Sequence, residues 1–505
     1  MSIPSGNDLY VRYAQLAAEH PDDLALIVER APFVGVRRTW AELLQRSDEI
    51  GRYFVKRGGG LGTRCAVVLN EHPDIIPLLL ALWKSGATVV LLDKAWGAAR
   101  RQRVIEHAGA TLVADIAQEI EISSIAPGDM GAARPPFPSN TAMLGYTSGS
   151  TGDPKGVPFT HDKLALTMQA AAAAIVARRG AAPCRLGCSM RLSGSGVLNL
   201  HYTWAAFLDA AVVVLPELTL ETAKSYWSRI EDHQVEQMFL VPPLIELLNH
   251  LAVPPSPTLS PPICFTGSAP VSPRVQNTFR QRFGLPLYNA YGLSETMCAS
   301  FFGHVDSNGV AENSVGVPWL LEARLRDVNG EIVRGAGRGE LELTGPTLFE
   351  GYYDNAAATA SAFTERWFRT GDVASRDALG RYSIVGRLKE AVMKGGFCVY
   401  LNEVEESALA VQGVLEAAAV QVDLPQGGED IALIVRIAPS SRVLAREVLT
   451  HVRADLGAQL GPSRIVETDE PMPRTGQDKL DRARISQLWS TLSKQGHHGA
   501  VPAQA

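Results

Sequence analysis

Paired cysteines and clusters of like charge are absent from this sequence of 505 residues. The net charge is −6, with no block of Lys and Arg, whereas binding to a nucleic-acid backbone needs a clustered excess of positive charge. We therefore expect no nucleic-acid partner. The six cysteines are scattered and lack the close spacing of zinc sites and disulfide frameworks. This pattern favours a reducing cytoplasm.

Long hydrophobic runs and a secretion signal are absent as well. The longest apolar run, residues 164–177, is rich in alanine and contains Gln169. It is shorter than the roughly 18 to 20 residues that a membrane-spanning helix needs, so we predict a buried helix and no membrane span. Residues 1–29 lack the basic-then-apolar order of a signal peptide, so we expect no export.

The middle of the chain alternates between short apolar runs and segments of helical spacing. A chain of 505 residues is too long for one compact core, so two or more domains are expected. The alternation predicts an α/β fold, with parallel-rich sheets covered by helices. The expected strands are residues 65–69, 89–92, 111–114, 212–215, 238–241 and 263–265, and the expected helices are 73–84, 221–233 and 244–251.

After Gly386 the pattern changes to that of a smaller α+β domain. Asn402 as a cap, with Glu405 three residues later, predicts a helix start, and Gly413 predicts its end. Two paired strands, 417–422 and 431–437, and a helix over 446–456 are expected to follow. We predict a large domain over residues 1–387, a small domain over 388–492, and a disordered tail over 493–505, which has little to bury.

Residues 146–156 read Tyr-Thr-Ser-Gly-Ser-Thr-Gly-Asp-Pro-Lys-Gly, with hydroxyls and glycines around the single Lys155. Glycine lets backbone N–H groups approach a polyanion, while the hydroxyls add donors and Lys155 adds charge. The Walker pattern does not match, because Pro154 stands where it needs glycine. A flexible linker is disfavoured by the apolar flanks at 142–144 and 157–159. We predict a phosphate-binding loop.

Four further motifs follow this loop. They are Asn-Ala-Tyr-Gly-Leu-Ser-Glu-Thr at 289–296, Arg-Thr-Gly-Asp at 369–372, Gly-Arg-Leu-Lys at 386–389, and Pro-Arg-Thr at 473–475 with Lys479. In this order they resemble the adenylate-forming enzymes, which include acyl-CoA synthetases, adenylation domains and firefly luciferase. The resemblance covers nearly the whole chain and is strongest to acyl-CoA synthetases. It implies a small β-barrel-like part in the large domain and a mobile small domain.

The resemblance also implies a two-step reaction that uses ATP and Mg²⁺. A carboxylate attacks the α-phosphate of ATP to give an acyl-adenylate and pyrophosphate, and a thiol then displaces AMP to form a thioester. The first step depends on positioning and charge neutralisation, because the carboxylate approaches a phosphate that is already anionic.

By resemblance, each motif has a role toward the nucleotide. Tyr291 is expected to pack on adenine, Glu295 to bind Mg²⁺, which prefers hard oxygen ligands, and Thr296 to touch the α-phosphate. The β- and γ-phosphates are assigned to Thr147, Ser148, Gly149, Ser150, Thr151, Gly152 and Lys155. The opposite wall of the adenine site is assigned to Gly267, Ser268, Ala269 and Pro270, and Asn289, Ala290 and Gly292 flank Tyr291.

The resemblance assigns further roles near the domain boundary. Asp372 is expected to accept both ribose hydroxyls, and Arg387 to reach the ribose or a phosphate. Lys389 stands at the hinge about which the small domain turns between the two half-reactions. The alternatives are a plain turn for Asp372 and a surface ion pair for Arg387.

Lys479 is expected to be a mobile catalytic ammonium that meets the carboxylate and the α-phosphate when the small domain closes. Two residues depart from the family pattern. Asp478 stands where glycine usually precedes this lysine, and it adds a negative charge. Met393 stands where some relatives have lysine, which disfavours a luciferase-like oxidation.

Residues 190–198 correspond to the acid-binding wall of the family. They contain neither the aspartate of enzymes that load α-amino acids nor the histidine or aromatic residue of many acyl-CoA synthetases. A buried ammonium without a partner is costly, so α-amino acids are disfavoured. The small residues 193–196 favour a bulky or apolar acyl group. His201 and Trp204 either line this site or belong to the core.

Gly395 and Gly396 resemble the segment that lines the tunnel for a phosphopantetheine arm. Coenzyme A and a carrier protein share that arm, and we expect the acceptor to be supplied in trans. Three hypotheses stay open: an acid:CoA ligase, an adenylation enzyme that loads a separate carrier protein or releases the adenylate, and a catalytically weak ATP-binding regulatory protein. The sequence does not decide the oligomeric state.

Overall fold

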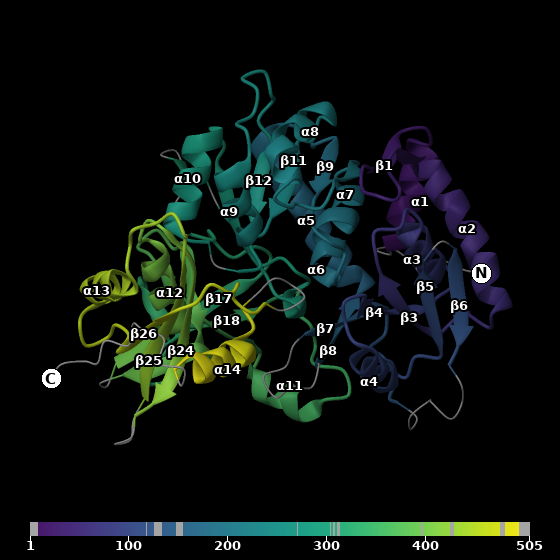
Figure 1. The fold of residues 1–505 in the computed structure, drawn as a ribbon. Helices are drawn as coiled ribbons and strands as arrows, with labels where there is room; N and C mark the ends of the chain where they lie inside the picture. Colours follow the sequence, from purple (N-terminus) through teal and green to yellow (C-terminus); the bar gives the residue numbers. More distant parts are fainter. Residues whose placement is uncertain are drawn as a thin grey trace. The chain divides into compact units, whose positions relative to one another are not determined.

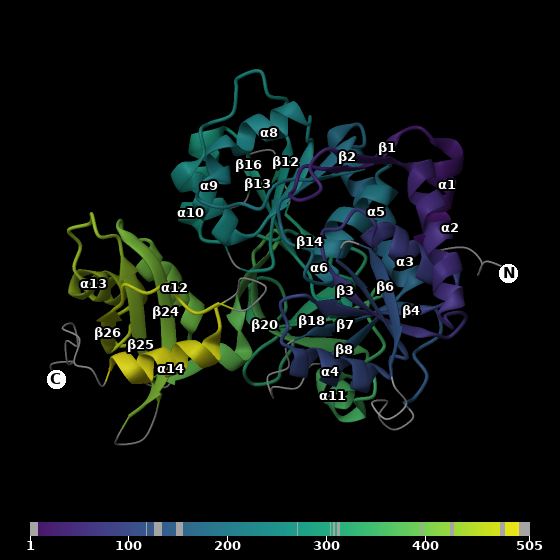
Figure 2. The same ribbon diagram turned by 45° about the vertical axis from the view of Figure 1, so that its right-hand side comes forward.

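The computed structural model describes residues 9–117, 119–125, 134–147, 155–269, 271–303, 305–306, 309–310, 314–394, 397–424, 429–474 and 480–493. The chain forms two compact units (Figures 1 and 2). Unit 1 comprises Met1–Val271, Val275–Glu322 and Leu343–Phe368, and unit 2 comprises Ser272–Arg274, Ala323–Glu342 and Arg369–Ala505. The expected hinge boundary after residue 387 stays a prediction.

Unit 1 contains a six-stranded sheet. Its strand order is β6 (Ile120–Ser124), β5 (Leu112–Ile116), β3 (Arg64–Leu69), β4 (Thr88–Asp93), β7 (Thr141–Thr147) and β8 (Lys155–Thr160). The four inner strands pair in parallel, and β6 and β8 pair antiparallel at the edges. Strands β3 and β4 are buried along nearly their whole length, as expected for strands covered on both faces.

A second sheet of unit 1 has eight strands. Their order is β14 (Phe301–Phe302), β13 (Leu287–Tyr291), β12 (Ile263–Thr266), β11 (Gln237–Leu240), β9 (Arg185–Cys188), β10 (Ala211–Val214), β1 (Leu24–Val28) and β2 (Val36–Thr39). All neighbours are parallel except β14 and β2 at the two edges. The predicted parallel-rich α/β class is therefore confirmed.

Helices lie between and after the strands of these sheets along the chain. They are α1 (Leu9–Glu19), α2 (Trp40–Lys56), α3 (Ile75–Lys84), α4 (Ala98–Ala108), α5 (His161–Arg179), α6 (Ser195–Val197), α7 (Trp204–Phe207), α8 (Tyr226–Asp232), α9 (Pro242–Leu251), α10 (Pro273–Phe283) and α11 (Ala356–Ala362). Short helices are the π-helix η1 (Leu198–Thr203) and the 3₁₀ helices η2 (Thr222–Ser225), η3 (Ser294–Thr296) and η4 (Leu388–Glu390), and a small hairpin pairs β15 (Val305–Asp306) with β16 (Gly309–Val310).

The expected elements of the first 265 residues lie where the pattern predicted them. Each of the six expected strands matches an observed strand to within two residues at either end. The apolar run at 164–177 is part of helix α5. Among the helices that the structure describes, none is long and apolar enough to cross a membrane.

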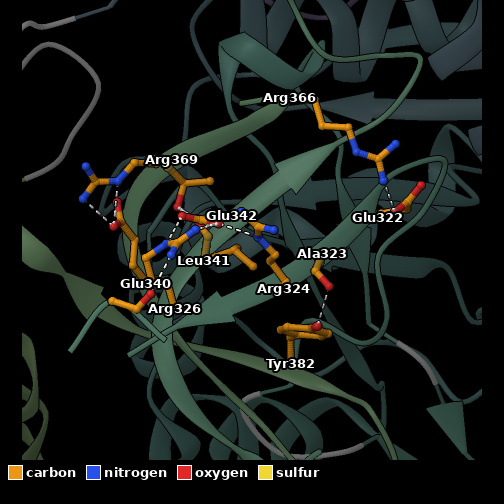
Figure 3. A network of polar contacts seen from close by, with 12 residues as sticks. Glu322, Ala323, Arg324, Arg326, Glu340, Leu341, Glu342, Arg366, Arg369 and Tyr382 are labelled. Atoms are coloured by element: carbon orange, nitrogen blue, oxygen red, sulfur yellow. Dashed lines mark hydrogen bonds and ion pairs between the residues drawn. The ribbon is translucent and has the colours of Figure 1, made fainter. Parts of the chain in front are cut away.

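A five-stranded sheet follows in the chain. Its order is β17 (Glu322–Arg326), β18 (Gly337–Thr344), β20 (Trp367–Arg376) and β19 (Phe363–Thr364), with β21 (Tyr382–Arg387) also paired to β20. Glu342 on β18 accepts hydrogen bonds from Arg324 at 2.5 Å and Arg326 at 2.6 Å (Figure 3). The small β-barrel-like part that the resemblance implied for the large domain stays a prediction.

The rest of unit 2 is an α+β layer structure. The hairpin of β22 (Ala391–Lys394) and β23 (Phe397–Tyr400) leads into α12 (Leu401–Leu409), and β24 (Val414–Asp423), β25 (Glu429–Ile437) and β26 (Arg464–Glu467) form a sheet. Helices α12 and α13 (Ala445–Leu456) pack on one face and α14 (Arg482–Leu492) on the other (Figure 2). The expected pairing of two strands around 426–428 is confirmed, because Asp423 pairs with Glu429.

The predicted cap of α12 is wrong. Strand β23 passes directly into the helix, so that Tyr400 precedes the first turn and its N–H donates to Glu403 at 3.3 Å. Asn402 is already helical, and its amide donates to the carbonyl of Val385. Glu405 is buried and pairs with Arg482 of α14. The cap therefore lies two residues earlier than the sequence pattern predicts.

Candidate functional site

The phosphate loop connects the antiparallel strands β7 and β8. Thr147 pairs directly with Lys155, and Tyr146 pairs with Gly156. The hairpin therefore brings the first and last predicted phosphate ligands together at the base of the loop. The predicted ligands Ser148, Gly149, Ser150, Thr151 and Gly152 lie outside the described residues.

A partly buried histidine contacts Tyr146 at the end of β7. The Tyr146 hydroxyl lies 2.8 Å from His107 Nδ1. Burial lowers the pKa of His107, and the positive charge of Arg134 lowers it further, while burial raises the pKa of Tyr146. Both side chains are therefore neutral at neutral pH, and the contact is a hydrogen bond that positions the end of β7.

The motif at 289–296 ends in a tight turn that presents Glu295. The Leu293 N–H donates to the Thr296 hydroxyl at 3.0 Å, and Ser300 donates to the same oxygen at 2.6 Å. Met297 and Cys298 then adopt left-handed backbone angles, with φ of 56° and 71°. Strain of this kind persists where the surrounding contacts enforce it and is common at functional sites.

Thr296 is fully buried, and its hydroxyl holds this turn. A contact between that hydroxyl and the α-phosphate therefore stays a prediction, and the observed role of Thr296 is to shape the turn that carries Glu295.

Glu295 and Lys155 meet the same tyrosine. The Tyr352 hydroxyl donates to Glu295 Oε1 at 2.8 Å, and Lys155 Nζ lies 4.8 Å from the centre of the Tyr352 ring. The backbone N–H of Phe349 donates to the Glu295 carbonyl at 2.8 Å. The structure thus brings the predicted phosphate ligand and the predicted magnesium ligand together. The sequence prediction missed Tyr352; the only available signal was a pair of adjacent tyrosines after Gly351.

The predicted adenine walls lie at the carboxyl ends of two neighbouring parallel strands. Thr266 of β12 pairs with Asn289 of β13, so the segment Gly267, Ser268 and Ala269 emerges beside Ala290 and Tyr291. Ligands of open α/β sheets bind at such carboxyl ends. Pro270 lies outside the described residues.

Two details suit this location to a ligand. A Cβ at Gly267 would lie 2.5 Å from the Ala290 carbonyl oxygen and 3.0 Å from the Phe239 ring, so only glycine fits. Asn289 is buried, and its side-chain oxygen has no hydrogen-bond partner among the described residues. A buried unsatisfied acceptor calls for an explanation, and an adenine amino group is a suitable donor.

In unit 2, Asp372 and Arg387 are brought together. They are paired residues of β20 and β21, and Arg387 Nε lies 2.9 Å from Asp372 Oδ1. The Asp372 side chain is 5% exposed, whereas that of Arg387 is 43% exposed. The sequence prediction gave both residues roles toward the nucleotide but did not pair them. Lys389, the predicted hinge, is exposed on η4.

The other predicted residues of unit 2 lie outside the described residues, namely Gly395, Gly396 and Lys479. The residues on either side of the undescribed stretch 475–479 contact each other. Arg474 and Leu480 form a β-bridge, and the Asp481 N–H donates to the Pro473 carbonyl at 2.9 Å. Arg482, three residues after Lys479, pairs with Glu390 at 3.1 Å and also with Glu405.

The predicted acid-binding wall continues into the π-helix η1, a form that is frequent at functional sites. His201 and Trp204 are each 1% exposed, and Trp204 packs against Phe265 and Phe302. Burial lowers the pKa of His201 to about 4, so it is neutral at physiological pH. The contacts of Trp204 are those of a core residue. Asn199, which the sequence prediction missed, donates to Cys298 Sγ at 3.7 Å and so ties this wall to the Glu295 turn.

Comparison with known proteins agrees with this geometry. Residues 13–353 match the family model of the AMP-binding enzyme, and residues 403–479 match the model of the AMP-binding enzyme C-terminal domain. The chain therefore belongs to the AMP-binding enzyme family and is an enzyme. Its chemistry is ATP-dependent acid adenylation.

Individual relatives are similar over nearly the whole chain. Feruloyl-CoA synthase of Amycolatopsis sp is 28% identical, with 89% of this chain and 94% of the relative covered. Sulfoacetate–CoA ligase of Cupriavidus necator is also 28% identical, with 93% and 95% covered. The structure of o-succinylbenzoate coenzyme A synthetase from Bacillus subtilis, in complex with ATP and a magnesium ion, has a TM-score of 0.79 at 21% identity, with 94% and 99% covered.

Proposed function

We propose that this enzyme activates a carboxylic acid other than an α-amino acid as the acyl-adenylate and transfers the acyl group to coenzyme A. The observation that carries the proposal is the convergence of Lys155 and Glu295 on Tyr352. A cation from a hydroxyl-rich loop beside a carboxylate on a tight turn suits a magnesium-bound polyphosphate. The match to two relatives named as a CoA synthase and a CoA ligase supports the choice of acceptor.

The residues of unit 1 fit a magnesium nucleotide. Mg²⁺ in phosphate-transfer sites is usually held by one or two carboxylates together with substrate phosphates, and Glu295 supplies such a carboxylate. When bound, the ion neutralises charge on the phosphates of ATP. Lys155, with the hydroxyl groups of the loop, would bind the β- and γ-phosphates and retain the pyrophosphate leaving group. Tyr291 and the segment from Gly267 would bind adenine.

The residues of unit 2 complete the proposed mechanism. Asp372 would accept the ribose hydroxyls, with Arg387 holding its carboxylate in place. Lys479 would stabilise the charge that develops as the acid carboxylate attacks the α-phosphate, which is the task of an oriented cationic donor. The small domain would then turn about Lys389, and the segment with Gly395 and Gly396 would admit the thiol arm.

The acid is proposed from the wall at residues 190–198. Residues 190–198 contain no carboxylate of their own to pair with a substrate ammonium, and Glu71, which accepts from the Leu192 N–H at 3.0 Å, is paired with Arg30. The small residues Ser193, Gly194, Ser195 and Gly196 favour a bulky or apolar acyl group.

ATP–pyrophosphate exchange with a panel of aromatic, fatty, dicarboxylic and amino acids tests the proposal. We expect exchange with bulky or apolar acids, and AMP release that depends on free CoA. Release that depends on a phosphopantetheinylated carrier protein would indicate the adenylation-enzyme alternative. Preference for a small amino acid would contradict the pocket argument, and absence of exchange with every acid would leave the regulatory alternative.

A further inference from the structure

Tyr352 stands between two side chains of opposite charge from distant parts of the sequence. Its hydroxyl donates to Glu295 Oε1 at 2.8 Å, and its ring lies 4.8 Å from Lys155 Nζ. Lys155 begins strand β8, Glu295 lies on η3, and Tyr352 follows strand β18. All three residues belong to unit 1.

Backbone hydrogen bonds hold Tyr352 in this place. Its own N–H donates to the Thr359 hydroxyl at 2.9 Å, and the N–H of Tyr353 donates to the Gly156 carbonyl at 2.9 Å. The N–H of Phe349 donates to the Glu295 carbonyl, and the Phe349 ring meets the Tyr352 ring edge-on at 4.9 Å. The segment 349–353 is therefore bonded to the Glu295 turn and to the residue after Lys155.

The two contacts of Tyr352 use different properties of its side chain. An ammonium over an aromatic face is attracted while its three N–H donors stay able to bind phosphate. A hydroxyl that donates to one carboxylate oxygen orients the group and leaves lone pairs for a metal ion, as the partners of metal-binding carboxylates generally do.

We propose that Tyr352 is a positioning residue that orients Glu295 toward Mg²⁺ through its hydroxyl and holds Lys155 for the phosphates through its ring. This inference rests on the proposed function, because it takes the roles of Lys155 and Glu295 from there. It assigns separate roles to the hydroxyl and the ring of one side chain, and the hydroxyl can be removed while the ring is kept.

Three variants separate these properties. Tyr352→Phe keeps the ring and removes the hydroxyl, and Tyr352→Leu removes both. Tyr353→Phe is the matched control, because it removes a neighbouring hydroxyl that bonds Arg64 at 2.9 Å and the Pro135 carbonyl at 2.7 Å. Binding of a non-hydrolysable ATP analogue is measured by calorimetry over a range of Mg²⁺ concentrations, and thermal unfolding monitors the fold.

For Tyr352→Phe we expect about tenfold more Mg²⁺ to be needed for half-maximal tightening of nucleotide binding, because a hydrogen bond to a charged group is lost. Affinity at saturating Mg²⁺ should stay near wild type. For Tyr352→Leu, affinity at saturating Mg²⁺ should also fall several-fold, because Lys155 loses its aromatic contact. Tyr353→Phe should match wild type in both measurements.

A Mg²⁺ response of Tyr352→Phe equal to that of wild type overturns the inference. If Tyr352→Phe lowers thermal stability, a double-mutant cycle with Glu295→Gln decides: the tyrosine acts through the glutamate only if its loss adds nothing to the Mg²⁺ defect of Glu295→Gln. Wild-type protein that neither binds the analogue nor exchanges pyrophosphate would instead refute the proposed function.

Discussion

The buried carboxylate of Glu342 offers a sharp test of how burial sets the contribution of an ion pair to stability. Glu342 lies on β18, beside the strand β20 that carries Asp372. Its side chain is 0% exposed and is paired with Arg324 at 2.5 Å and Arg326 at 2.6 Å, whose side chains are 19% and 23% exposed (Figure 3). In Glu342→Gln one oxygen is replaced by an NH₂ group, which faces an arginine donor.

The expected loss follows from burial. Removing one partner of a buried pair costs about 3–5 kcal/mol. Both arginines keep some contact with water here, so we expect a loss of about 2–3 kcal/mol in the free energy of unfolding. The control is Glu322→Gln, which removes a carboxylate 3.2 Å from Arg366 with both side chains about two-thirds exposed, at 65% and 67%. Exposed pairs contribute roughly 0–1 kcal/mol.

The pH dependence provides a second readout. Burial raises the pKa of Glu342, but hydrogen bonds from Arg326 and Arg324 more than offset this, and the net pKa is lowered. A carboxylate with a lowered folded pKa contributes stability that is complete above its unfolded pKa and is lost as pH falls through the folded value. The difference between wild type and Glu342→Gln should therefore be constant from pH 6 to 8 and shrink in acid.

Urea unfolding followed by circular dichroism measures both effects. The free energies of unfolding of Glu342→Gln and Glu322→Gln should differ by most of the expected loss of about 2–3 kcal/mol, because the two ion pairs differ mainly in burial. Equal stability of Glu342→Gln and Glu322→Gln would refute the argument that burial makes the Glu342 pair important.

Three further predictions concern single residues. Lys479→Ala should lower adenylation by roughly 10²–10³ and keep thioester formation from a supplied acyl-adenylate; equal loss in both half-reactions would contradict its role. Gly267→Ala should weaken ATP-analogue binding, because its Cβ would lie 2.5 Å from the Ala290 carbonyl oxygen; unchanged calorimetric affinity would show that this wall does not meet the nucleotide. Burial lowers the pKa of His201 to about 4, so the unfolded chain takes up a proton first, and stability should fall by up to about 1.4 kcal/mol per pH unit between pH 6.5 and about pH 4. His201→Asn should remove this slope in urea titrations, and an identical slope would assign it to other groups.

Local sequence patterns predict these helices and strands, because the pattern of apolar residues within each one indicates its type. Runs such as residues 65–69 and 89–92 are buried on both faces, and their continuous apolar character reflects that. The sequence predicts too late a start for α12, because Asn402 and Glu405 have the spacing of a helix cap. In the structure the Asn402 side chain bonds Val385, and the Glu405 side chain pairs with Arg482. Contacts with residues distant in the sequence determine the roles of these two side chains, and the local sequence does not show such contacts.

The residue types of the site were predictable, but its contacts were not. Lys155 and Glu295 were singled out from motifs, yet the tyrosine that joins them lies 57 residues beyond Glu295. The pairing of Asp372 with Arg387 depends on the register of β20 and β21. The Thr296 hydroxyl, which we expect to contact the α-phosphate, accepts a hydrogen bond within the turn. The left-handed backbone of Met297 and Cys298 in this turn is not indicated by the motif.

The central claim is that the acid carboxylate attacks the α-phosphate of ATP. It is tested most directly with an acid active in exchange, labelled with ¹⁸O in both carboxylate oxygens and incubated with ATP, Mg²⁺ and CoA. We predict that mass spectrometry finds one ¹⁸O atom in the AMP product, because the oxygen that bonds the α-phosphate leaves with AMP when the thiol attacks the acyl carbon. Unlabelled AMP, or ADP as the product, would contradict the account.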